Sequence, residues 1–217
     1  MDWTEIAALP TAALSRVTDA QDLRARFEGP GDHVVRRQLD RLDAHGRRFV
    51  ELSPFLLLAS GDPSRGLDVS PRGDAPGFVR VLDDTRLVLP DRPGNNRLDT
   101  FHNILAWPSV ALLFLVPGLR ECFRVNGEAT VCDEPALRAA CSAQGREPKL
   151  VVVVDVKEAF FHCGKAAIRS RLWEDDHRAE RGAFPSLAEI TADQIRGRER
   201  LDEIAAKVDA NYKLNFY

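Results

Sequence analysis

Short apolar runs recur along the chain and are separated by turn residues, a pattern typical of β-strands. The runs at 110–116 and 150–156 are the most apolar, and we expect them to be buried. Strands at such short spacing, with few helices between them, favour a closed or nearly closed antiparallel barrel over a βαβ sheet. We predict strands at residues 54–60, 67–72, 77–82, 85–90, 109–116, 120–131 and 150–161.

Other segments have the polar and apolar spacing of helices. Apolar positions three and four residues apart predict a helix over residues 32–52, with Asp32 as its N-cap. A helix over residues 96–106 would end at Trp107, because this residue precedes a proline. We also predict one or two short helices within residues 2–28, a helix at 133–145 and a charged helix at 187–208.

Composition narrows the classes of function. The chain has 217 residues, 44% of them hydrophobic, which is enough for a sizeable core. A net charge of -3 gives no reason to expect nucleic acid or an anionic membrane as a partner, and the apolar runs are too short to span a bilayer. The four cysteines and five histidines lack metal-binding spacing, so we expect no metal site. We expect the cysteines to be reduced thiols and the protein to be cytoplasmic.

The segment PDRPGNNRLDTFHNIL, residues 90–105, combines a turn with two arginines. With a helix starting at Asn96, Arg97 would lie in the first turn, where positive charge is unfavourable. A bound anion would offset this cost, and phosphate held by arginine and asparagine at a helix start is a recurring arrangement. The alternative is a plain turn whose arginines pair with Asp91 and Asp99.

Two further segments place basic residues at the ends of predicted strands. The segment DVSPRGDAPG contains Ser70 and Arg72, and by itself it would be an ordinary hairpin turn. The segment FHCGKAAIRSRLW places Lys165 and Arg169 four residues apart, so they share a helix face and repel unless an anion or carboxylate intervenes. Three basic clusters, each at the edge of a β element, together favour one anion-binding pocket.

The motifs SPRGD, PDRPGNNR, FRVNG and HCGKAAIRSRLW are similar to those of the pyridoxamine 5′-phosphate oxidase-like flavoproteins, and the resemblance covers about residues 49–173. One departure is Phe123, which stands where leucine is usual. The resemblance implies a mainly β fold with flanking helices, namely an FMN-binding split β-barrel. It also implies a homodimer with the cofactor at the subunit interface. We therefore predict a helical extension (1–48), the barrel (49–173) and a charged helical tail packed on the same domain (174–217).

The same resemblance assigns residues to parts of the cofactor. Those expected around the FMN phosphate are Arg92, Asn95, Asn96 and Arg97. Those expected along the flavin and its ribityl chain are Ser70 and Arg72, and those presenting backbone to the isoalloxazine edge are Pro90 and Asp91. Those expected to close the pocket, from this chain or its partner, are Lys165, Arg169 and Trp173.

We therefore expect an FMN-dependent oxidoreductase that moves electrons or hydride between a reduced cofactor and a small organic substrate. No residue is assigned as catalytic. The alternatives on the same fold are a flavin- or haem-binding protein without turnover and a deazaflavin-dependent reductase. The apolar run at 110–116 would be buried either in the barrel core or in a two-fold interface.

Overall fold

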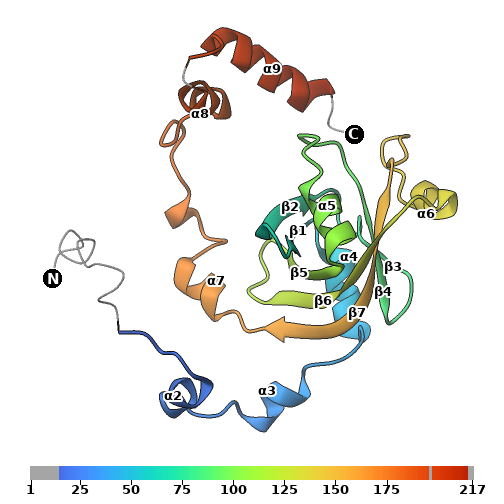
Figure 1. The fold of residues 1–217 in the computed structure, drawn as a ribbon, viewed down its shortest axis with the longest axis vertical. Coiled ribbons are helices and arrows are strands. Elements are labelled where there is room, and N and C mark those ends of the chain that lie inside the picture. The colour runs from blue at the N-terminus through green and yellow to red at the C-terminus, as the bar shows by residue number, and fades with distance from the viewer. Residues whose placement is uncertain (1–14, 196, 215–217) are drawn as a thin grey trace. The chain divides into compact units, whose positions relative to one another are not determined.

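A computed structural model of the chain describes residues 15–195 and 197–214. Its main element is a seven-stranded antiparallel sheet with the strand order β2-β1-β5-β6-β7-β4-β3 (Figure 1). The strands are β1 (Phe55–Asp62), β2 (Gly66–Gly73), β3 (Arg80–Val81), β4 (Arg86–Pro90), β5 (Ser109–Leu115), β6 (Cys122–Cys132) and β7 (Val151–His162). The predicted fold, mainly β with flanking helices, is confirmed. Of the predicted strands, the one at 77–82 is the most shortened, because only the two residues of β3 pair with β4.

Residue contacts divide the chain into two units, residues 1–37 and 38–217. In the first unit the described helices are α2 (Ala20–Ala25) and α3 (Asp32–Arg36), and residues 1–14 lie outside the described part. Those of the second are α4 (Ala44–Leu52), α5 (Asp99–Ala106), α6 (Pro135–Ala140), α7 (Lys165–Ser170), α8 (Leu187–Gln194), α9 (Leu201–Leu214) and the 3₁₀ helix η2 (Asp175–His177). Within 15–195 and 197–214, no helix combines the length and apolar character needed to cross a membrane. The domain boundaries after residues 48 and 173 stay a prediction.

The single helix predicted over residues 32–52, with Asp32 as its N-cap, is wrong. Leu39, between α3 and α4 in the sequence, forms a β-bridge with Ala159 of β7. The backbone N–H of each donates to the carbonyl oxygen of the other, at 3.0 and 2.7 Å. Backbone groups engaged in this bridge cannot close helical turns. α4 starts afresh with its own N-cap, Asp43, whose carboxylate accepts a backbone N–H at 2.7 Å.

The charged tail likewise forms two helices, and the single helix predicted over residues 187–208 is wrong. Gly197 lies between α8 and α9 with a φ of 69°, in the left-handed region that ends a right-handed helix. The two helices pack against each other and bury Ala188 and Ile204. Most other described side chains of this tail are exposed to solvent.

The apolar run at 110–116 forms β5, whose side chains alternate between two faces. One face is buried in the core with α4 and α5, through Val110, Leu112 and Phe114. The other face is only partly buried, and its residues are Ala111, Leu113 and Leu115. The run therefore serves the core through one face and leaves an apolar second face partly exposed.

Candidate functional site

A cavity of about 830 Å³ lies where β2, the loop after β4, the start of α5 and the segment before β7 meet. This volume falls in the range of small-molecule sites. The predicted site residues that line it together are Ser70, Arg72, Asp91, Arg92, Asn95, Asn96 and Arg97. Its wall also includes Thr100 and Lys149.

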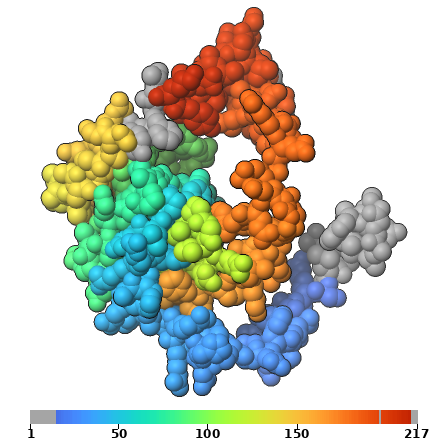
Figure 2. Space-filling model, turned by 180° about the vertical axis from the view of Figure 1, so that it is seen from behind, coloured from blue at the N-terminus to red at the C-terminus, as the bar shows by residue number. Residues whose placement is uncertain are grey.

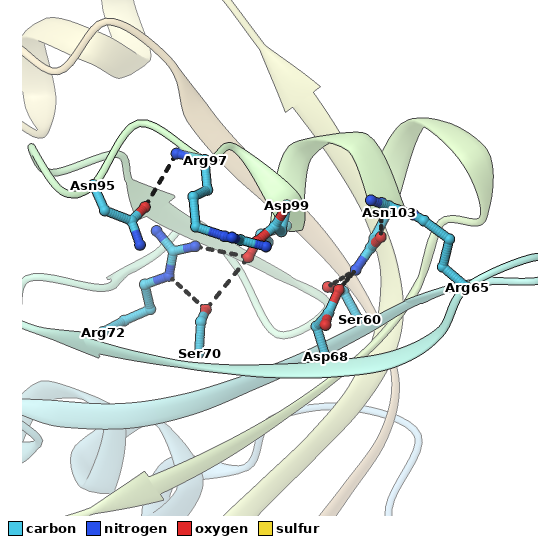
Figure 3. Close-up of polar contacts among 10 residues, drawn as sticks. Ser60, Arg65, Asp68, Ser70, Arg72, Asn95, Arg97, Asp99 and Asn103 are labelled. Carbon is cyan, nitrogen blue, oxygen red and sulfur yellow. Dashed lines mark hydrogen bonds and ion pairs between the residues drawn. The ribbon is translucent and has the colours of Figure 1, made fainter. Parts of the chain in front are cut away.

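Arg72 is held at the cavity wall by two hydroxyl groups. Its Nε donates to Ser70 Oγ at 3.2 Å and its Nη2 donates to Thr100 Oγ1 at 2.8 Å (Figure 3). Thr100 is buried on α5, so these contacts tie β2 to α5. Burial lowers the pKa of the Arg72 guanidinium, and the charge of Asp91 opposes this effect. Arginine nevertheless stays charged at neutral pH.

Within the described part of the chain, no counter-ion contacts the charge of Arg72. Among the described residues, its only hydrogen bonds go to the two hydroxyl groups, and it forms no ion pair. A positive charge removed from water is costly unless an acceptor or anion compensates it. Half-buried beside an open cavity, Arg72 is therefore suited to an electron-rich ligand.

The loop between β4 and α5 is fixed to the rest of the site by polar contacts. The Nε of Arg92 donates to the carboxylate of Asp74 at 2.6 Å, and the two side chains are only 18% and 4% exposed. Further along, Asn95 Oδ1 accepts a hydrogen bond from the backbone N–H of Arg97 at 3.1 Å (Figure 3). The loop thus holds a defined conformation beside the cavity.

The helix after this loop starts later than predicted. α5 begins at Asp99, with Leu98 as its N-cap, so the placement of Arg97 in the first helical turn is wrong. The reason is the backbone of Asn96 and Leu98, whose φ angles of 56° and 60° are left-handed. This conformation costs about 1 kcal/mol in a residue such as leucine, and strain of this kind concentrates at functional sites.

The alternative of aspartate-paired arginines holds for one of the two. Arg97 donates to the Asp99 carboxylate at 2.7 Å, as that alternative predicts. Arg92 instead donates a hydrogen bond to the carboxylate of Asp74. The Arg97 side chain is 70% exposed, and exposed ion pairs contribute little to stability. Its pairing with Asp99 therefore leaves it able to bind an anion.

Pro90 and Asp91 lie at the end of β4, where this strand meets β7. Pro90 is buried and does not line the cavity, whereas Asp91 does. The backbone N–H of Asp91 donates to the carbonyl oxygen of Leu150 at 3.0 Å, which fixes its position. Burial raises the pKa of the Asp91 carboxyl, and nearby positive charges, Arg72 foremost, oppose this shift.

The three residues expected to close the pocket do not line this cavity in the described part of the chain. Lys165 and Arg169 are exposed on α7. Trp173 Nε1 donates to the carbonyl oxygen of Leu119 at 2.7 Å, in the turn between β5 and β6. Figure 2 shows that turn in yellow-green beside the orange segment that follows β7. Within one chain, these three residues therefore do not share the cavity with the loop between β4 and α5.

A buried amide positions α5 against the sheet. The side chain of Asn103 is fully buried, and its Nδ2 donates to Ser60 Oγ at 3.1 Å and to the Asp68 carboxylate at 2.7 Å. Its Oδ1 accepts from Arg65 Nη2 at 2.8 Å (Figure 3). Asn103 thus fixes α5 on β1 and β2, and with it Thr100 one turn earlier.

Sequence reasoning missed Asp74, Thr100 and Lys149. The polar positions 100 and 103, next to buried Phe101 and Ile104, are a signal that could have drawn attention to Thr100. Lys149 and Asp74 have no such local signal, because they reach the site only through strand pairing and loop folding. In the described ranges, no group of three or more His, Cys, Asp or Glu side chains could hold a metal ion.

Comparisons with known proteins identify similar solved structures and one matching family model. Three of these structures serve as examples. HupZ from Group A Streptococcus is 15% identical, with a TM-score of 0.46, and the match covers 55% of this chain and 93% of HupZ. A Clostridium acetobutylicum protein related to general stress protein 26 is 9% identical, with a TM-score of 0.43, and the match covers 55% of this chain and 86% of that protein. An FMN-binding protein from Syntrophomonas wolfei is 12% identical, with a TM-score of 0.40, and the match covers 53% of this chain and 86% of that protein.

No curated protein matches the chain. Because the three TM-scores are below 0.5, the assignment rests on a family model rather than on these structures. The model described as pyridoxamine 5′-phosphate oxidase matches residues 42–163, more than half of the chain. The chain therefore belongs to the pyridoxamine 5′-phosphate oxidase family.

Proposed function

We propose that the chain binds FMN in the cavity beside Arg72 and acts as a flavin-dependent oxidoreductase on a small organic substrate. The observation that carries this proposal is the half-buried charge of Arg72, which has no ion pair among the described residues and lines a cavity of about 830 Å³. FMN combines a phosphate with a ring rich in hydrogen-bond acceptors. Membership of the pyridoxamine 5′-phosphate oxidase family supports a flavin.

Bound FMN would supply the transfer of electrons or hydride, and the chain would bind, orient and electrostatically tune it. The groups proposed to hold the phosphate are Arg92, Asn95, Asn96 and Arg97. Ser70 and Arg72 would lie along the ring and ribityl chain, where the charge of Arg72 favours negative charge on the ring. Pro90 and Asp91 would lie at the edge of the ring system.

We further propose a homodimer with the cofactor at the subunit interface. Lys165, Arg169 and Trp173 do not line the cavity within the described residues of one chain, so a partner chain would have to supply them to the pocket. Apolar side chains on β2 support an interface, since Leu67 is 77% and Val69 is 63% exposed. A cytoplasmic location, expected from the four free cysteines, also stays a prediction.

A visible absorption spectrum of the purified protein tests this function. After addition of FMN and removal of the excess, we expect retained flavin bands that bleach with a reductant and return in air. An Arg72→Gln variant should retain much less FMN at the same protein concentration. A wild-type protein that retains no flavin would contradict the proposal, and bands typical of haem or a deazaflavin would identify another cofactor. Turnover with NADH or NADPH and small acceptors then separates an enzyme from a carrier.

A further inference from the structure

Two opposite charges line the cavity without touching each other. Arg72 and Asp91 act on each other electrostatically, but they form no ion pair. Half-buried charges of opposite sign usually pair, because desolvation is costly. Here each of the two residues is held in place by its own contacts. Arg72 is held by Ser70 and Thr100, and the Asp91 backbone is held by Leu150.

Each of the two groups has unused hydrogen-bonding capacity. The Nε and Nη2 atoms of Arg72 have partners, while its Nη1 has none among the described residues. The carboxylate of Asp91 accepts no hydrogen bond and forms no ion pair in the same part of the chain. The cavity therefore presents N–H donors beside a carboxylate acceptor, and a complementary ligand has an acceptor next to a donor.

We propose that Arg72 and Asp91 together recognise an imide edge of the ligand, with Arg72 donating to a ring carbonyl and Asp91 accepting from the adjacent ring N–H. This inference rests on the proposed binding of FMN, whose pyrimidine ring carries a C2 carbonyl next to the N3–H. A single hydroxyl would have to meet both groups through one oxygen. An imide instead supplies the acceptor and the donor on separate atoms, which suits two charges that are held apart.

The arrangement gives Asp91 a role in specificity. A carboxylate accepts from an N–H through a charge-assisted hydrogen bond, roughly twice as strong as a neutral one. A ligand methylated at that nitrogen cannot make the bond and leaves the carboxylate half-buried without a partner. The negative charge of Asp91 also disfavours added negative charge on the ring, so it should lower the midpoint potential of the bound flavin.

Titration of the protein with FMN and with 3-methyl-FMN, followed by flavin fluorescence, tests this inference. Wild type should prefer FMN by roughly tenfold or more, the scale of a lost charged hydrogen bond. Asp91→Ala should bind FMN more weakly and reduce the preference to about twofold or less. Glu128→Gln removes an exposed carboxylate that pairs with Lys157 at 3.4 Å, outside the cavity, and should keep the wild-type preference.

Asp91→Asn keeps the size of the side chain but removes its charge, so it distinguishes an electrostatic role of Asp91 from a steric one. The midpoint potential of FMN bound to this variant should shift to a more positive value, whereas a purely steric role would leave it unchanged. Equal affinity of wild type for both flavins, or a preference that persists in Asp91→Ala, would overturn the inference while FMN binding stands. A wild-type protein that binds neither flavin would overturn the proposed function and this inference together.

Discussion

At the scale of single residues, Arg97 and Arg86 form similar surface ion pairs in different places. Arg97 pairs with Asp99 and Arg86 with Asp83, both at 2.7 Å, but only Arg97 lines the cavity. We expect Arg97→Ala to weaken FMN binding by about 1.5 kcal/mol, the lower end for a charged hydrogen bond, because the side chain is exposed. Arg86→Ala is the matched control and should leave the affinity unchanged. Equal dissociation constants for the two variants in a fluorescence titration would remove Arg97 from the phosphate site.

The ionised carboxylate of Asp91 should strengthen ligand binding but lower the stability of the folded protein without ligand. Burial raises its pKa, so folding favours the protonated form, and this contribution is complete below the unfolded pKa of about 3.9. It is lost as the pH rises through the folded pKa, so the ionised carboxylate costs stability at pH 7. Asp91→Asn should therefore raise the free energy of unfolding of the flavin-free protein at pH 7, by less than about 1 kcal/mol because solvent screens the group, and the Tm should rise with it.

The advantage of Asp91→Asn should shrink as the pH falls towards 4, because wild type then becomes protonated at this position. Thermal unfolding of both proteins across that range measures the effect. A variant that is less stable than wild type at pH 7 would show that the carboxylate has a stabilising partner in the folded protein.

At the scale of elements, the site depends on how α5 sits on the sheet. Asn103→Ala removes a buried amide and leaves Ser60, Asp68 and Arg65 without this partner. We expect a loss of about 2–3 kcal/mol in the free energy of unfolding, the scale for buried polar groups left unsatisfied. FMN affinity should fall as well, because Thr100 on the same helix holds Arg72. Denaturant unfolding measures the stability, and His102→Ala, an exposed neighbour, is the control.

The elements that sequence predicts well are those specified by local patterns. Alternation of apolar residues marks β5 and β7, since a strand with one buried face repeats every two residues. The start of α5 could not be predicted in this way, because left-handed backbone at Leu98 has no signal in a non-glycine residue. The bond between Arg92 and Asp74 was equally hidden, because it joins a loop to the residue after β2 across 18 positions. Motif resemblance indicated the loop residues that line the cavity together, but not the residues that hold them in place.

At the scale of the whole molecule, the proposed dimer would use the outward face of the sheet. The strand registers place Val69 of β2 beside Ala59 of β1, and Ala59 beside Ala111 of β5. These positions alternate with core residues, so they share the face turned away from the core. An apolar face left this open favours contact with a second copy, because association removes it from water.

Val69→Lys places a charge on the edge strand of that face, and burial of an unpaired lysine in an interface is costly. We expect the variant to be monomeric in analytical ultracentrifugation and to lose FMN at concentrations where wild type retains it. Leu105→Lys is the matched control, because Leu105 is 75% exposed on α5 and does not line the cavity. It should leave both assembly and flavin content unchanged.

Dilution of wild type should release flavin and dissociate the dimer over the same concentration range. A Val69→Lys monomer that still holds FMN tightly would contradict the interface model, because the pocket would then be complete within one chain.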